Sequence, residues 1–212
     1  MTAGPTRESL DPVRYLSNHS TGEMGYAVAR EAQRRGWQVT LLSGPVALEA
    51  PAGVQMVYIS SALELEKACK KYFPLNDILV MSAAVCDFRL KNTAKQKLKR
   101  RGQLRLTLEK TPDILAMLAD RKKQQLMIGF CLETEHWLSR ARHKLMEKKL
   151  DGIVANRLSS RYSPFGAVKA DVAFLDKSST ARRLKSKSKK SLARSLLIWA
   201  ESLQCQKAVQ KK

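Results

Sequence analysis

Hydrophobic and polar positions along the chain follow the periods of helices and strands in alternation. In the segment 24–35, apolar side chains recur at helical spacing, and Gly36 provides a typical C-terminal cap. Similar patterns predict helices at 61–73, behind a cap at Ser60 or Ser61, and at 134–149 and 191–203. A further helix is expected to open at Thr111-Pro112-Asp113, with Thr111 as cap and Pro112 as the first helical residue.

Short apolar and β-branched runs lie between these helices. The predicted strands are 37–42, 54–59, 77–82, 104–108, 126–130, 151–155 and 172–175. The run 77–82 (DILVMS) is continuously apolar at its centre, which is typical of a strand buried on both faces. Repeated strand–helix alternation predicts an α/β fold with a Rossmann-like, doubly wound, mostly parallel sheet and helices on both faces. Ligands bind such sheets beyond the carboxyl ends of the strands. Residues 82–87, 129–133 and 155–156 are therefore expected at one edge.

Two polar segments interrupt this pattern. Residues 90–103 are rich in lysine and predict a mobile basic loop, and residues 177–190 predict a basic connector before the last helix. The length of 212 residues fits a single domain over 1–212.

The charge is unevenly distributed. The chain holds 39 basic and 19 acidic residues, a net charge of +20, but residues 1–90 contain nine of each. The excess therefore lies in residues 91–212, whose surface should attract polyanions. A basic nucleic-acid-binding module without catalysis is the alternative that this charge supports, although no recognised binding motif appears.

Other composition features narrow the class of protein. The four cysteines are scattered without metal-site spacing, which makes a disulfide framework unlikely and favours a reducing cytoplasm. No apolar run reaches the length of a membrane helix, so no membrane association is expected.

The most informative segment is a glycine-rich start, TAGPTRE at 2–8, followed by DPVRYLSNHSTGEMG at 11–25. A glycine-containing loop that opens into a helix can present backbone N–H groups to an anion. The segment lacks the GxGxxG spacing of dinucleotide sites, and no acidic residue ends the strand 37–42. Both facts count against a nicotinamide-dependent oxidoreductase.

The string DPVRYLSNHSTGEMG resembles the signature of the phosphopantothenoylcysteine synthetase (phosphopantothenate–cysteine ligase) family, which also forms the carboxyl-terminal domain of bifunctional coenzyme A biosynthesis flavoproteins. Further stretches agree in order: LLSGPV at 41–46, SAAVCDFR at 82–89, KQKLK at 95–99, TPDIL at 111–115, GFCLET at 129–134 and KKLDGIVAN at 148–156. The similarity covers most of residues 2–156.

The resemblance implies a two-step ligase reaction. The carboxylate of 4′-phosphopantothenate attacks the α-phosphate of a nucleotide, usually CTP in bacteria with ATP as the alternative, and pyrophosphate leaves. The resulting acyl-nucleotidylate reacts with the amino group of L-cysteine and releases CMP. It also implies Mg²⁺ as cofactor and a homodimer. The flavoprotein half of the bifunctional proteins has no counterpart in the sequence, so no flavin is expected.

The resemblance further implies roles for individual residues. Asn18 matches the asparagine that assists conversion of the acyl-nucleotidylate, where an amide can donate to a developing oxyanion. Lys97 matches a lysine ten residues after Asp87 and is assigned, with Asn18, to catalysis. The implied nucleotide-binding residues are Ser82, Ala83, Asp87, Lys97, Pro112, Asp113, Ile114, Leu115, Phe130, Lys144 and Lys148. The implied substrate-binding residues are Gly4, Asn18, Ala83 and Ala84.

Plainer interpretations exist for several of these residues. Lys144 and Lys148 lie at positions i and i+4, and a solvated helix face would also explain them. Phe130 is expected against the nucleotide base, although an apolar strand residue commonly belongs to the core.

The chain departs from the family pattern in places. Thr111 stands at a usual asparagine, Cys131-Leu132 at two small residues, Glu23 at a common lysine and Cys86 at an alanine. Family members also carry an apolar strand before the segment that matches TAGPTRE, so a shortened or missing first strand is expected at the centre of the sheet.

Overall fold

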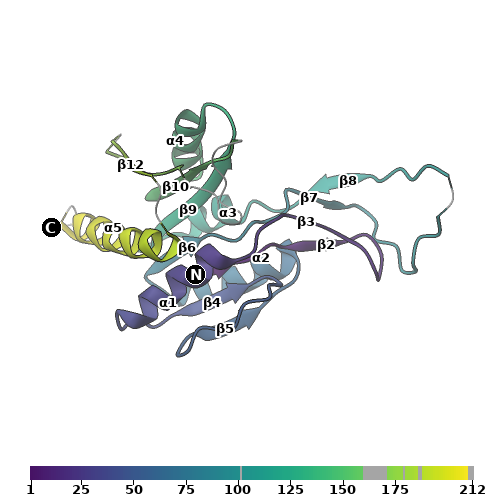
Figure 1. The fold of residues 1–212 in the computed structure, drawn as a ribbon, viewed down its shortest axis with the longest axis horizontal. Coiled ribbons are helices and arrows are strands. Elements are labelled where there is room, and N and C mark those ends of the chain that lie inside the picture. Colours follow the sequence, from purple (N-terminus) through teal and green to yellow (C-terminus); the bar gives the residue numbers. More distant parts are fainter. Residues whose placement is uncertain (101, 160–170, 179, 186–187, 210–212) are drawn as a thin grey trace.

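The computed structural model describes residues 1–100, 102–159, 171–178, 180–185 and 188–209. These residues form an eight-stranded sheet covered by helices on both faces, with two small ribbons extending from it (Figure 1). The predicted α/β class with a doubly wound, mostly parallel sheet is confirmed. The sheet strands, in spatial order, are β12 (Ala181–Lys185), β11 (Asp171–Asp176), β10 (Gly152–Arg157), β9 (Leu126–Glu133), β6 (Ile78–Met81), β1 (Thr2–Ala3), β4 (Thr40–Ser43) and β5 (Gln55–Tyr58). The helices are α1 (Glu23–Arg34), α2 (Ala62–Tyr72), η1 (Phe73–Leu75, a 3₁₀ turn), α3 (Ile114–Arg121), α4 (Trp137–Glu147) and α5 (Lys189–Val209).

Six neighbouring strands of the large sheet, from β5 to β10, run parallel; β11 pairs antiparallel with β10, and β12 pairs antiparallel with β11. The two-residue strand β1 lies at the centre, where Thr2 pairs with Leu42 of β4 on one side and with Met81 of β6 on the other. The carboxyl ends of the parallel strands therefore meet at one edge of the sheet.

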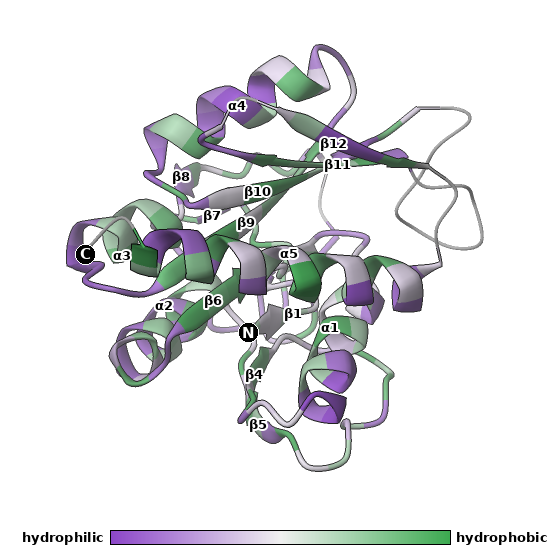
Figure 2. Cartoon of the chain, turned by 90° about the vertical axis from the view of Figure 1, so that its left-hand side faces the viewer, coloured by the Kyte–Doolittle hydropathy of each residue, from purple (hydrophilic) through white to green (hydrophobic). Residues whose placement is uncertain are grey.

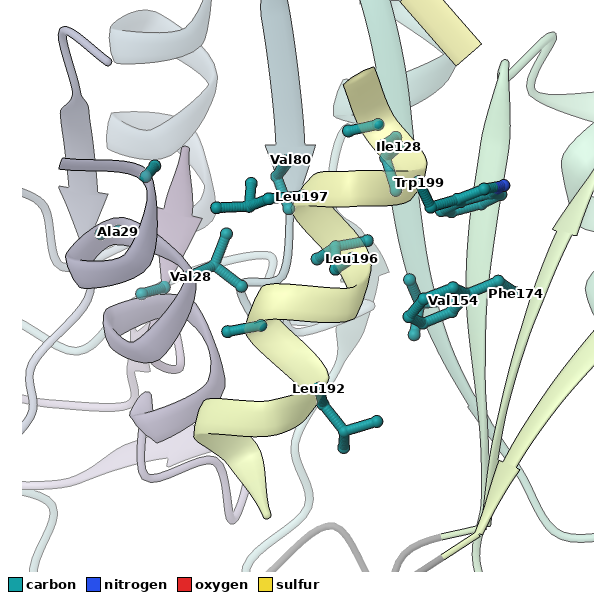
Figure 3. Close-up of a cluster of buried hydrophobic side chains, with 14 of the residues drawn as sticks. Val28, Ala29, Val80, Ile128, Val154, Phe174, Leu192, Leu196, Leu197 and Trp199 are labelled. Carbon is teal, nitrogen blue, oxygen red and sulfur yellow. The ribbon is translucent and has the colours of Figure 1, made fainter. Parts of the chain in front are cut away.

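One face of the sheet packs against α1 and α5. The α5 residues Leu192, Leu196 and Leu197 recur at helical spacing and are buried between α1 and the strands (Figure 3). Trp199 of the same helix stacks on Phe174 of β11, with ring centroids 4.9 Å apart. Helix α5 therefore packs both on α1 and on β11, at the antiparallel end of the sheet.

The other face packs against α2, α3 and α4, through buried residues such as Leu65, Leu118 and Leu145. Hydrophobic residues follow the central strands, and hydrophilic residues lie on the outer sides of the helices (Figure 2). Within the described residues, no helix is both long and apolar enough to cross a membrane. Ser61 caps α2, as predicted, because its hydroxyl accepts the Glu64 N–H.

Three local predictions are corrected. The segment 177–190 is not only a connector, because its residues 181–185 form β12, which pairs with β11 at the edge of the sheet. The strand expected at 104–108 begins only at Leu108, where β8 (Leu108–Lys110) pairs with β7 (Phe88–Leu90). Helix α3 starts two residues later than expected, because Asp113 rather than Thr111 caps it by accepting the Ala116 N–H.

The ribbons form a feature that periodicity did not reveal. We call it the arm: the hairpin of β2 (Arg7–Ser9) and β3 (Tyr15–Ser17), and the ribbon β7–β8 with its connecting segment 91–107. The Ala94 N–H donates to the Leu10 carbonyl, and the Thr93 hydroxyl donates to the Ser9 carbonyl. The arm extends away from the sheet (Figure 1). In its described residues the segment expected as a basic loop, 90–103, holds no regular structure after Leu90.

A buried carboxylate joins α1 to α5. Glu31 is 6% exposed and accepts hydrogen bonds from Arg34 and Arg35, and Arg35 also binds Glu201 of α5. The hydrogen bond from Arg34, followed by that from Arg35, outweighs the effect of burial and lowers the pKa of Glu31 from 4.5 to about 2.

Because this pKa is lowered on folding, the contribution of Glu31 to stability is present above its unfolded pKa of 4.5 and is lost as the pH falls towards 2. We expect Glu31→Gln to lower the free energy of unfolding at pH 7 by about 2 kcal/mol. The difference from the wild type should shrink between pH 4.5 and 2. Urea unfolding at several pH values measures it, with Glu49→Gln, in an exposed loop, as control. A difference that stays constant with pH would contradict the assignment.

Candidate active site

The carboxyl edge of the sheet is built around the ends of β1 and β6. The Thr2 hydroxyl accepts the Ala83 N–H (3.0 Å), and the Ser82 hydroxyl donates to the Thr2 carbonyl (2.7 Å). The Ala84 N–H donates to the Gly4 carbonyl (2.9 Å). Ser82, Ala83 and Ala84 are thus held alongside Gly4, and four residues predicted from the sequence meet at one place.

Glycines allow the first turn of α1 to stand directly over these strand ends. A Cβ on Gly25 would lie 2.5 Å from the Ala3 Cβ and 2.7 Å from the Ser82 Oγ, so no larger residue fits. Gly4 has φ 75°, in the left-handed region that favours glycine. The helix has no side-chain cap at Gly22. Its first backbone N–H groups are therefore available to an anion at this edge.

Asn18 follows β3 and reaches the same edge. Its Nδ2 donates to the Ala84 carbonyl (3.0 Å) and makes a long 3.9 Å contact to the Cys86 thiol. Because a carbonyl can only accept, the nitrogen of the amide must face Ala84. One N–H of Asn18 is therefore used in this hydrogen bond. The residue is exposed, so its second N–H and its amide oxygen lie at the surface.

Two threonines outside the predicted set of site residues hold the backbone of Cys86 at this edge. The Thr6 hydroxyl accepts the Cys86 N–H (2.9 Å), and the Thr111 hydroxyl donates to the Cys86 carbonyl (2.5 Å). The Thr111 N–H donates to the Asp87 carbonyl (3.0 Å). Burial raises the pKa of the Cys86 thiol, and the charges of Glu8 and Asp87 add to this effect, so the thiol stays protonated. Asp87 itself is exposed beside α3.

Helix α4 brings two of the predicted lysines to the site. Lys144 donates to Glu133 at the end of β9 (2.7 Å), and Lys148 lies 3.0 Å from Asp113, the cap of α3. Burial lowers the pKa of Lys144, but the hydrogen bond to Glu133, the charge of Glu133 and that of Asp87 together raise it above the ordinary value. Both lysines have acidic partners, and both side chains keep partial exposure to solvent.

The start of α3 completes this group. Pro112 and Asp113 precede the helix, Ile114 is buried, and Leu115 is partly buried against the core. The ion pair of Lys148 with Asp113 joins the start of α3 to the end of α4, so the predicted residues of both helices lie close together.

The structure does not bring Lys97 to these residues. The Leu98 N–H donates to the Asp11 carboxylate (3.1 Å), and Arg14 binds both that carboxylate and the Leu98 carbonyl. The hydrogen bond from Arg14 holds the pKa of Asp11 well below its usual range. Lys97 therefore belongs to the part of the arm that is held beside the turn of the β2–β3 hairpin. The arm and α4 extend in different directions from the sheet (Figure 1).

Phe130 is also set apart from those lysines. Its side chain packs against the hydrophobic cluster beneath α1 and α5, on the face of the sheet opposite to α3 and α4. The core interpretation of Phe130 thus describes its side chain in this structure, and contact with a nucleotide base stays a prediction.

The described residues offer no preformed metal centre, since no group of three or more His, Cys, Asp or Glu side chains among them could hold an ion. A hollow beside the site is lined by Glu133, Arg140 and Lys144 together with neighbours on α4. An apolar hollow at the opposite end of the strands, near Met1 and Cys69, contains none of the predicted site residues.

The chain matches the DNA/pantothenate metabolism flavoprotein C-terminal domain over residues 1–203. It is 43% identical over 169 residues to the coenzyme A biosynthesis bifunctional protein CoaBC of Bacillus subtilis. It is likewise 43% identical over 172 residues to the protein of that name from Escherichia coli. Each alignment covers 79% of this chain and 42% of the relative, so the chain spans about two fifths of the length of the curated relatives it matches.

Solved structures show the same fold. The crystal structure of the C-terminal domain of CoaBC superposes with a TM-score of 0.81 at 36% identity, covering 95% of this chain and 92% of that one. A Cab2 variant in complex with phosphopantothenate-cysteine superposes with a TM-score of 0.80 at 16% identity, covering 99% of this chain and 87% of that one. The latter similarity concerns the fold alone.

Proposed function

We propose that this chain, which belongs to the DNA/pantothenate metabolism flavoprotein C-terminal domain family, is a phosphopantothenate–cysteine ligase of coenzyme A biosynthesis. The observation that carries the proposal is the meeting of Asn18, Ala83 and Ala84 with the first turn of α1 at one edge of the sheet. The 43% identity to CoaBC supports it.

The proposed reaction has two steps. A carboxylate oxygen of 4′-phosphopantothenate attacks the α-phosphorus of a nucleoside triphosphate, and pyrophosphate leaves with the electrons of the broken P–O bond. The amino nitrogen of L-cysteine then attacks the acyl carbon of the acyl-nucleotidylate. The nucleoside monophosphate leaves, and the nitrogen loses a proton, which gives the amide product.

We assign the residues at the edge of the sheet to two groups, one for each of the first two substrates. Gly4, Ala83, Ala84 and Asn18 receive phosphopantothenate. The second N–H of the Asn18 amide and the uncapped start of α1 offer hydrogen-bond donors to anionic and carbonyl oxygens, and the small residues Gly4, Ala83 and Ala84 let the substrate approach closely. The surface formed by Asp87, the start of α3, Lys144 and Lys148 receives the nucleotide, since lysine ammonium groups stabilise phosphate charge.

The nucleotide is proposed to be CTP, with Mg²⁺ entering on its phosphates. Mg²⁺ commonly binds through substrate phosphates with only one or two carboxylates, and it therefore needs no preformed protein site. We also propose a homodimer. Exposed apolar side chains gather on the arm, among them Val13, Tyr15, Phe88, Leu104 and Leu106, and a second copy could bury them.

The test of the function is to mix the protein with 4′-phosphopantothenate, L-cysteine, Mg²⁺ and each nucleoside triphosphate in turn. We expect pyrophosphate release with CTP and a product with the mass of phosphopantothenoylcysteine. Release of pyrophosphate with ATP alone would correct the nucleotide. Absence of product with every nucleotide, from a protein shown to be folded, would contradict the function.

The lysines make a prediction of their own. Lys144→Ala and Lys148→Ala should each raise the KM for the nucleotide by about ten- to a hundredfold, the effect of losing one charge-assisted contact. The KM for phosphopantothenate should change little. Lys70→Ala is the matched control, because Lys70 also pairs with an acid on a helix, Glu66 of α2. Unchanged nucleotide kinetics in both variants would mean that Lys144 and Lys148 belong to a solvated helix face and do not bind the nucleotide.

Lys97→Ala belongs in the same series, because the resemblance assigns Lys97 to the triphosphate whereas the structure holds it on the arm. A rise in nucleotide KM equal to that of Lys144→Ala would mean that an arm reaches the nucleotide site during turnover. This arm would belong either to the same chain or to a second copy of it. No change would remove Lys97 from the nucleotide-binding set.

Asn18→Ala should separate the two half-reactions. Activation depends on groups that meet the triphosphate, whereas aminolysis needs an amide near the acyl carbonyl, and loss of one such group costs about 10²–10³ in rate. We expect one pyrophosphate per site and accumulation of the acyl-nucleotidylate, detected by mass spectrometry of a quenched single turnover.

Asn76→Ala is the control for Asn18→Ala. The Asn76 amide also donates to a backbone carbonyl, that of Tyr72, but it precedes β6 and so lies at the opposite edge of the sheet. A folded Asn18 variant that releases no pyrophosphate would place Asn18 in activation or binding, and one with normal turnover would make it a turn residue.

A further inference from the structure

We propose that Glu133 is a positioning residue for the nucleotide: its buried carboxylate holds the ammonium group of Lys144 at the carboxyl edge of the sheet. This inference rests on the proposed function, because it assumes that Lys144 meets a triphosphate. It adds a residue for which neither the sequence pattern nor the resemblance gives a role.

Glu133 is fixed by its place in the sheet. It is the last residue of β9, directly opposite Arg157 of β10, and its carbonyl accepts the Leu158 N–H (2.9 Å). Its side chain is only 8% exposed. Because its backbone belongs to the parallel ladder, the position of its carboxylate is determined by the sheet rather than by a loop.

The carboxylate is satisfied by cations of α4. Oε1 accepts from the Lys144 Nζ at 2.7 Å, and Oε2 lies 3.5 Å from the Arg140 Nη1. The Lys144 side chain is 41% exposed, so its ammonium group binds Glu133 and also faces solvent. Lysine has three N–H donors, and one hydrogen bond to Glu133 leaves donors for an incoming phosphate.

The neighbouring pair shows a different arrangement. Lys148, one helical turn further on, pairs with Asp113, but the Asp113 side chain is 48% exposed and ends a loop before α3. An exposed pair of this kind fixes a lysine only weakly, because water screens the charges. Of the two lysines on this face of α4, Lys144 is therefore the one with a buried anchor.

Holding Lys144 has two opposing effects on a bound triphosphate. Glu133 offsets part of the positive charge, which weakens attraction of the anion. It also restricts the rotamers of the long Lys144 side chain before the ligand arrives, so that less conformational entropy is lost when the ligand binds. The buried carboxylate has a fixed position, whereas an unpaired lysine side chain would sample many rotamers in solvent. We infer that positioning outweighs the loss of charge.

The experiment compares Glu133→Gln with the wild type in nucleotide kinetics and in calorimetric titration with CTP and Mg²⁺. We expect the KM and the Kd for CTP to rise by about tenfold, the factor for one charge-assisted contact, with the KM for phosphopantothenate unchanged. Glu66→Gln is the matched control: it makes the same change at a carboxylate that is 15% exposed and pairs with Lys70, on helix α2, which carries none of the predicted site residues.

The decisive readout is the dependence on Lys144. In a Lys144→Ala background, Glu133→Gln should no longer raise the KM for CTP, because the group that Glu133 positions is absent. A merely structural role would weaken binding in both backgrounds. A fall or no change in the KM in the wild-type background would overturn the inference, as would an equal rise in both.

Glu133→Asp provides a second variant should Glu133→Gln fail to fold. It keeps the charge but withdraws the carboxylate by one methylene, and an intermediate rise in KM is expected only if position matters. The proposed function is judged separately by product formation in the wild-type protein. A wild type that makes product while the Glu133 variants bind CTP normally would refute this inference alone.

Discussion

The structure depends on a close approach of three backbones at the end of β1. Gly25 allows the first turn of α1 to contact Ala3 and Ser82, and a Cβ at Gly44 would lie 1.9 Å from the Pro5 carbonyl oxygen. Hydroxyl groups of Thr2 and Ser82 close the remaining gaps with hydrogen bonds. Because large side chains do not fit here, the N–H groups of the helix, the strand ends and the Asn18 amide lie close together. Several hydrogen-bond donors in a small volume suit an anionic ligand with several oxygen atoms.

The rest of the fold supports this edge from both faces. Helix α5 packs on α1 and on the sheet, and Arg35 joins the two helices by binding Glu31 of α1 and Glu201 of α5. On the other face, α3 and α4 are placed by their buried leucines, so their polar ends reach the same edge as the start of α1. Rigid elements therefore carry both sides of the proposed site, and a small shift in either helix would separate them.

Charge at the site is paired before any ligand arrives. Lys144 and Lys148 have acidic partners, and Asp87 lies near enough to contribute to the raised pKa of Lys144. Pairing limits the motion of both lysine side chains, but the acidic partners weaken the positive field at the site. The large basic excess of residues 91–212 acts over longer distances, since such a surface attracts anions of any kind.

Sequence periodicity alone determined the α/β class and most of the large sheet, because helices and buried strands impose their periods on a single stretch of chain. The glycine-rich start and the strings up to residue 156 also indicated the family. Only the tertiary structure decided which charges meet. It paired Lys144 with Glu133, placed Lys97 on the arm and turned Phe130 towards α5. It also formed β12 from a basic segment that reads as a connector. These outcomes depend on contacts between residues far apart in the chain, and no local pattern encodes a partner that the fold brings from a distance.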